Sequence, residues 1–122
     1  MRVLLSIKPE FAEKIFEGTK QYEFRRAIFK NSEIKTIVVY ASSPVQKVIG
    51  EFEIEDILKE GLASLWKKTK SKSGIKEEYF YSYFGEKEEG YAIKIKNAKR
   101  YEEPLCLRSD FGLMPPQSFL YL

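Results

Sequence analysis

The sequence predicts an α+β fold, a small mixed β-barrel of about six strands with flanking helices. Short runs rich in β-branched residues recur along the chain, and amphipathic stretches with helical spacing lie between some of them. Gly50 interrupts the clearest strand, which indicates a bulge or the close approach of another backbone and hence a curved sheet. The 122 residues, 43% of them hydrophobic, are enough for one core, so we expect residues 1–122 to form a single domain.

The first half of the chain is expected to contain four strands and one helix. A helix beginning at Pro9 has its apolar residues at helical spacing, and Gly18 is suited to end it in a left-handed conformation. The continuous β-branched run before Ser42 is typical of a central strand. The expected elements are a strand over 3–7, a helix over 9–17, a strand after Lys20, and strands over 34–41 and 45–57.

The second half is expected to contain two helices and the remaining strands. Ile75, Tyr79 and Tyr83 recur at i, i+4 spacing with Phe80 and Phe84 beside them, so we expect most of these rings to lie in the core. The expected elements are a helix over 62–66, a polar basic loop over 67–74, a helix over 75–84, a strand over 91–96, a short buried piece over 105–107 and a last strand within 115–122.

Composition excludes several classes of site. The net charge of +3 and the pI near 8.9 are compatible with an anionic partner but are too small for a dedicated polybasic binder. A single cysteine, Cys106, cannot form an internal disulfide, and without histidine the usual zinc ligand sets are absent. We expect Cys106 to be a small core residue. We also expect the protein to bind no metal and no cofactor, to have no membrane-spanning segment and to be cytoplasmic.

The stretch from Gly18 to Arg26 combines opposite charges most densely. If Tyr22 and Phe24 point into a core, the strand period of two places Glu23 and Arg25 together on the opposite face. Lys20 precedes them at a helix-to-strand turn and could converge with them on one ligand. The simpler alternative is an exposed salt bridge on an ordinary half-buried strand. A register slip of one residue would exchange Arg25 for Arg26 as the inward arginine.

Two further polar segments are candidates. Ser42 and Ser43 end the central strand before Pro44, where hydroxyls could face a ligand, although a plain turn has the same composition. The loop over 67–74 holds four lysines beside Trp66, a pattern that suits a strand of RNA or DNA, but a loop of this kind is also simply mobile and well solvated.

The pattern Gly18-x-Lys20-x-x-Glu23-x-Arg25 resembles that of the ASCH domain in the PUA-like superfamily. A strand ending in Ile7-Lys8-Pro9 precedes it, strands ending on Ser42-Ser43-Pro44 and passing through Ile49-Gly50-Glu51-Phe52 follow, and the ending over 115–119 is similar to that of small prokaryotic and phage members. The resemblance implies a PUA-like β-barrel with a cleft between barrel and helices, lined by Lys20, Glu23 and Arg25, and a role in RNA- or nucleotide-related chemistry.

Three functions follow as hypotheses. The first is a module that binds single-stranded RNA, a nucleotide or a nucleoside, in RNA metabolism or translation-linked regulation. The second is a hydrolase, a nucleoside amidohydrolase or a ribonuclease, with Lys20 and Glu23 as catalytic residues; the amidohydrolases that this chain resembles carry a threonine where it has Glu23. The third is a protein-interaction module. The candidate ligand-binding residues are Lys8, Lys20, Glu23, Arg25, Arg26, Ser42, Ser43, Lys67, Lys68 and Lys70.

The shape of the cleft distinguishes these hypotheses. A deep pocket in which Lys20 is buried favours an enzyme, because burial lowers the pKa of a lysine toward the range of a useful base. An open basic groove that runs toward residues 67–72 favours RNA binding, and a closed cleft favours an interaction surface elsewhere.

Overall fold

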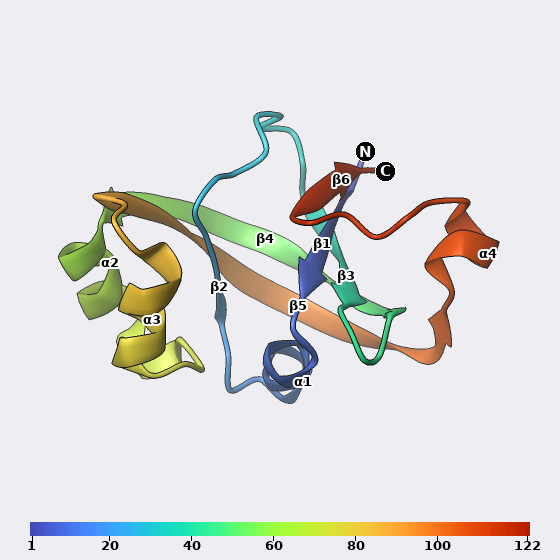
Figure 1. Ribbon diagram of the computed structural model, residues 1–122, viewed down its shortest axis with the longest axis horizontal. Helices are drawn as coiled ribbons and strands as arrows, with labels where there is room; N and C mark the ends of the chain where they lie inside the picture. The colour runs from blue at the N-terminus through green and yellow to red at the C-terminus, as the bar shows by residue number, and fades with distance from the viewer.

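The computed structural model describes residues 1–122 and shows a six-stranded sheet curled into a half-barrel, with helices at both ends and one helix between them, below the sheet in the view of Figure 1. This confirms the predicted mixed α+β barrel. The elements are β1 (Val3–Ile7), α1 (Pro9–Glu17), β2 (Tyr22–Arg25), β3 (Thr36–Ala41), β4 (Lys47–Gly61), α2 (Leu62–Thr69), the 3₁₀ turn η1 (Lys70–Lys72), α3 (Glu77–Phe84), β5 (Glu89–Leu105), α4 (Leu107–Phe111) and β6 (Phe119–Tyr121).

The sheet has the order β2-β5-β4-β3-β1-β6, in which β1 and β3 are parallel and the other neighbours antiparallel. Strands β2 and β6 are therefore its two edges, and no backbone ladder joins β2 to β1 or β6. The barrel stays open along this line, which we call the seam. Backbone N–H and C=O groups at the seam are free of the ladder, so side chains can take their place there.

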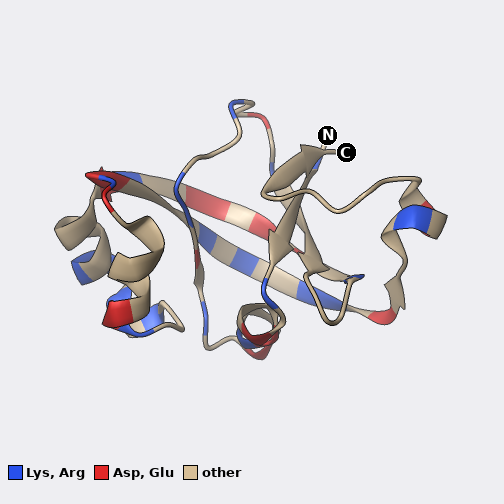
Figure 2. Cartoon of the chain, in the orientation of Figure 1, with Lys and Arg blue, Asp and Glu red and all other residues tan.

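Strands β4 and β5 form a long ribbon that curves across the molecule. Their pairing shifts register at three places, and each shift increases the bend. At Gly50 a Cβ atom would lie 2.6 Å from the Lys99 carbonyl oxygen and closer still to the Phe16 ring, so only glycine fits. The predicted close approach at Gly50 is confirmed. Acidic residues of β4 lie beside basic residues of β5 (Figure 2), and the Glu55 carboxylate is 2.8 Å from the Lys94 amino group.

Strand alternation assigns β2 to two different environments. Phe24 pairs with Ala92 and packs with Leu65, Phe80 and Phe84 under α2 and α3. Glu23 pairs with Ile93, which belongs to the main core beneath α1, so Glu23 faces the interior side of the sheet. The predicted alternation of β2 is confirmed. Its charged face is buried by the curl of the sheet.

Three local expectations were wrong. The piece over 105–107 is not one buried segment: Cys106 is only half-buried and begins α4, where its backbone N–H donates to the Asp110 carboxylate at 2.7 Å. A helix of five residues is too short to leave a periodic signal. The expected loop over 67–74 is largely helical, because α2 extends to Thr69 and η1 follows. The strand expected over 91–96 runs over Glu89–Leu105, because its polar residues lie on an exposed ribbon.

No helix of the chain has both the length and the apolar composition required to cross a bilayer.

Candidate functional site

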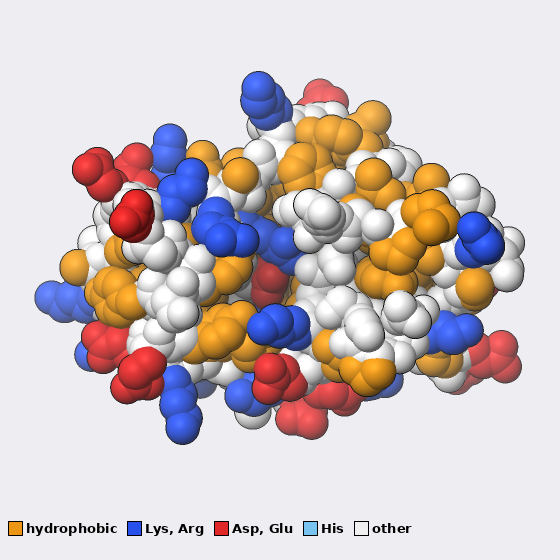
Figure 3. All heavy atoms as spheres, viewed as in Figure 1, with side chains coloured by type: hydrophobic (Ala, Val, Ile, Leu, Met, Phe, Trp, Pro, Cys, Tyr) orange, Lys and Arg blue, Asp and Glu red, His pale blue; other side chains and the backbone are white.

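A pocket of about 460 Å³ opens at the seam, between β2, the end of β1 and α3. Its lining includes Ser6 from β1, Glu23 and Arg25 from β2, and Tyr79 and Tyr83 from α3. In the space-filling view, acidic atoms lie at the bottom of a hollow in the centre of this face, with basic side chains on both sides (Figure 3). The pocket has the size typical of sites for small organic ligands.

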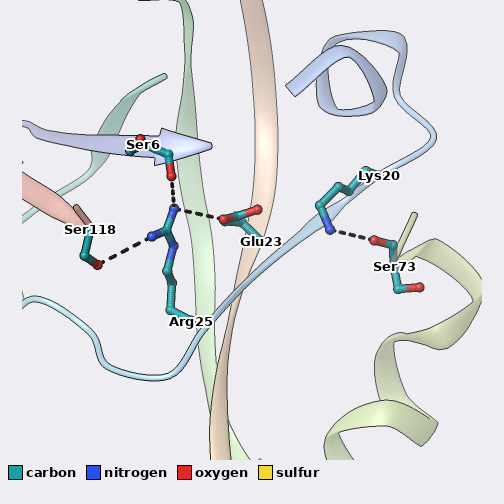
Figure 4. A network of polar contacts seen from close by, with 6 residues as sticks. All are labelled: Ser6, Lys20, Glu23, Arg25, Ser73 and Ser118. Atoms are coloured by element: carbon teal, nitrogen blue, oxygen red, sulfur yellow. Dashed lines mark hydrogen bonds and ion pairs between the residues drawn. The ribbon is translucent and has the colours of Figure 1, made fainter. Parts of the chain in front are cut away.

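Arg25 connects three segments of the chain across the seam (Figure 4). Its Nη2 donates to the Ser6 carbonyl oxygen at 2.8 Å and lies 3.0 Å from Oε2 of Glu23. Its Nη1 lies 3.5 Å from Oγ of Ser118, in the segment before β6. The Arg25 Nε is buried and has no hydrogen-bond partner in the protein. One side chain thus supplies the cross-links that a backbone ladder would otherwise provide.

The Glu23–Arg25 ion pair is buried. The two residues are 7% and 8% exposed, which rules out the alternative of an exposed surface salt bridge. Arg26 is exposed, so Arg25 is the inward arginine. Burying two charges costs desolvation free energy that their attraction barely offsets, so such a pair contributes little net stability. Its main effect is to hold a carboxylate and a guanidinium in fixed positions at the floor of the pocket.

Lys20 is also buried, with only 2% of its surface exposed. Its Nζ donates to the Ser73 carbonyl oxygen at 2.8 Å, in the connection between α2 and α3 (Figure 4). The amino group also lies 5.0 Å from the ring centroid of Phe24 and 5.3 Å from that of Phe11. Burial lowers the pKa of Lys20 to about 8, although the nearby Glu23 carboxylate opposes this shift. The Lys20 amino group therefore loses its proton at a pH of about 8, close to neutral pH.

Helix α3 forms the aromatic wall of the pocket. Tyr79 and Tyr83 face the pocket, while Phe80 and Phe84 point into the core on the opposite side of the helix. The expectation that most of these rings are core residues therefore holds for the phenylalanines. Tyr83 also packs against their cluster while lining the pocket, whereas Tyr79 lies outside the cluster. Burial raises the pKa of Tyr83, so its hydroxyl stays protonated and can donate a hydrogen bond at neutral pH.

The structure brings together six of the predicted site residues and leaves four outside. The pocket is lined by Lys8, Lys20, Glu23, Arg25, Arg26 and Ser42. Ser43, Lys67, Lys68 and Lys70 are exposed and lie outside it. Lys68 pairs instead with Glu60, at 2.6 Å. A contact of these four residues with a ligand stays a prediction. Sequence reasoning missed the pocket residues Phe11, Ile75, Tyr79, Tyr83, Gln117 and Ser118 as ligand contacts.

The pKa of Lys20 predicts a pH dependence of stability. Because the pKa is lower in the folded chain, about 8, than the ordinary lysine value of 10.5, the unfolded chain holds more protons between these values. The free energy of unfolding should therefore rise with pH across this range, by about 3 kcal/mol for this group. The measurement is urea denaturation of the wild type and Lys20→Met at several pH values from about 7 to 10.

The difference between wild type and Lys20→Met isolates this group from other residues that titrate in the same range. We expect the wild type to gain stability relative to the variant as the pH rises. A difference that stays constant with pH would show that Lys20 has an ordinary pKa and is not desolvated.

The family model of the ASCH domain matches residues 5–104. An ASCH domain-containing ribonuclease of Zymomonas mobilis is 30% identical over 124 residues, which cover 98% of this chain and 82% of that protein. The large ribosomal subunit protein uL22 of Ureaplasma parvum is 26% identical over 120 residues, or 98% of this chain and 39% of that protein. This chain thus spans about two fifths of the length of that relative.

Solved structures agree with the family match. The crystal structure of ASCH from Zymomonas mobilis has a TM-score of 0.90 and 30% identity, and the alignment covers 99% of this chain and 87% of that one. The N-terminal domain of Staphylothermus marinus McrB, at 13% identity, has a TM-score of 0.54 over 90% of this chain and 80% of that one, which shows a shared fold alone. The predicted resemblance is confirmed: this chain belongs to the ASCH domain family, which has a PUA-like fold and is associated with RNA.

Proposed function

We propose that the pocket binds a nucleotide, free or within single-stranded RNA, and holds its base against Glu23 and Arg25. The observation that carries this proposal is a buried, fixed ion pair at the floor of a pocket with aromatic walls. Arg25 contacts Oε2 of Glu23, which leaves Oε1 to accept a hydrogen bond from a base N–H group. The hydroxyl of Ser42 lies on the same lining and can complete the polar contacts.

The charges of the pocket favour a ligand whose base lies at the floor and whose phosphate stays near the solvent. A phosphate at the floor would meet the Glu23 carboxylate, whereas Lys8 and Arg26 are exposed and line the pocket nearer to solvent. Tyr79 and Tyr83 line the pocket and provide apolar surface against which a base can pack. This arrangement supports recognition of a base over a pure phosphate clamp. A cytoplasmic location, where RNA is abundant, is part of the proposal.

Glu23→Gln tests the proposal. Glutamine has the same shape, but its amide replaces one acceptor oxygen with a donor, so hydrogen bonds from a base should be lost. We expect binding of a short single-stranded RNA or of the matching nucleotide to weaken about 10- to 100-fold, as for the loss of a hydrogen bond to a charged group. Fluorescence anisotropy with a panel of labelled RNAs and competing nucleosides gives the affinities.

Glu53→Gln, at a half-buried position of β4 that does not line the pocket, is the matched control, and thermal melts verify that both variants are folded. Equal affinities of Glu23→Gln, Glu53→Gln and wild type would show that the ion pair does not contact the ligand.

RNA cleavage is the second candidate function, and the buried Lys20 favours it. A lysine with a pKa of about 8 is partly neutral at physiological pH and can accept a proton. In this proposal Lys20 takes the proton of a ribose 2′-hydroxyl, and the 2′-oxygen attacks the adjacent phosphorus. The bond to the 5′-oxygen of the next nucleotide breaks, and this leaving oxygen takes a proton from solvent water. The products are a 2′,3′-cyclic phosphate and a 5′-hydroxyl. A relative of this chain, in Zymomonas mobilis, is described as an ASCH domain-containing ribonuclease, which supports RNA cleavage as a candidate function.

The pH profile of cleavage tests this role. A neutral Lys20 is the active form, so the rate should rise with pH and level off above about 8, the pKa of the group. Lys20→Arg keeps the cation but cannot lose its proton, so it should bind RNA and fail to cleave it. A gel assay with an end-labelled RNA measures the cleavage rates of the variant and the wild type at each pH. Undiminished cleavage by Lys20→Arg would exclude Lys20 as the base.

A further inference from the structure

We propose that the pocket takes an internal nucleotide of single-stranded RNA, whose two flanking phosphates are held by Lys8 and Arg26. This inference rests on the proposed function and adds the form of the ligand. It distinguishes a nucleotide within a chain from a free nucleotide and from a chain end.

Lys8 and Arg26 lie on one aromatic platform formed by α3. The Nζ of Lys8 is 5.3 Å from the ring centroid of Tyr79, and the Cζ of Arg26 is 4.9 Å from that of Tyr83. The two tyrosine rings are one helical turn apart, with centroids separated by 6.4 Å and planes inclined by 9°. The cations are thus placed by a shared rigid element, although they come from different parts of the chain.

The two cations lie on opposite sides of the seam. Lys8 follows the end of β1 and Arg26 follows the end of β2, and both line the pocket. Both residues are exposed, and none of the ion pairs in the structure includes either one. Lys68, Lys94 and Arg100, by contrast, are each paired with a carboxylate. Lys8 and Arg26 therefore keep their charge available for an anion from solution.

Two free cations on either side of a pocket with an acidic floor fit a particular ligand geometry. The Glu23 carboxylate excludes phosphate from the interior, so the phosphates of the ligand stay at the mouth. A nucleoside monophosphate, or a chain end without a terminal phosphate, has a phosphate on one side only, whereas an internal nucleotide has a phosphodiester on each side. Turning one base out of a single strand costs less than extracting it from a duplex, so a flexible strand suits this site.

The test compares a pentanucleotide RNA, with 2′-fluoro sugars to prevent cleavage, with the 5′- and 3′-monophosphates of the same nucleosides. Affinities are measured against salt concentration for wild type, Lys8→Gln, Arg26→Gln and the double variant. Lys35→Gln is the matched control, because Lys35 is exposed and does not line the pocket. Each lost phosphate contact should lower the salt slope of RNA binding by about 0.7, and the double variant should lose about twice as much.

We expect the pentanucleotide to bind more tightly than either monophosphate, and each single variant to weaken its binding several-fold at low salt. Monophosphates that bind as tightly as the pentanucleotide, or a salt slope in Lys8→Gln equal to that of Lys35→Gln, would overturn this inference. The proposed function would survive either result as long as Glu23→Gln still weakens binding. If Glu23→Gln has no effect, the proposed function itself fails.

Discussion

The guanidinium of Arg25 holds together a barrel that its backbone leaves open. Strand β2 has no ladder to β1 or β6, and Arg25 bridges the seam by contacts to Ser6 and Ser118. The same group forms the buried ion pair with Glu23 that creates a charged floor in a pocket with an aromatic wall. Because such a pair adds little net stability, its value lies in fixing hydrogen-bonding groups before a ligand arrives. The open seam and the binding site are one feature.

A second buried cation positions the opposite wall. Lys20 donates to the Ser73 carbonyl oxygen, and Lys14 donates to that of Gly74 at 3.0 Å, so two lysines of the N-terminal region hold the segment that leads into α3. A Cβ at Gly74 would lie 2.6 Å from the Cβ of Lys20. This segment can therefore approach Lys20 so closely only because residue 74 is glycine. The charged stretch after α1 therefore determines both the floor of the pocket and the position of its tyrosines.

The part of the site that could be predicted from the sequence is the part made by local periodicity. Glu23 and Arg25 share a strand face two residues apart, and Lys20 lies just before them, so a short pattern was enough to find them. Tyr79 and Tyr83 could not be predicted as site residues, because helical spacing identifies a face of a helix but does not indicate whether that face meets a core or a cavity. Ser118 could not be predicted either, because it lies 93 residues from its contact Arg25 in the sequence, beyond the reach of any local pattern. The lysines over 67–70 were chosen for their density in sequence, but they belong to a helical segment that does not line the pocket.

The most direct test of the role of Arg25 is the NMR signal of its side-chain Nε–H group during a titration with nucleotide or short RNA. This Nε is buried and without a hydrogen-bond partner in the protein, so its proton should exchange slowly and respond strongly to a new neighbour. A ligand bound against the ion pair should shift this signal while the Nε–H signals of Arg100 and Arg108, both exposed and outside the pocket lining, stay unchanged. Saturable binding that leaves the Arg25 signal in place and shifts backbone amides of residues 67–72 would contradict binding of the ligand at the Glu23–Arg25 ion pair.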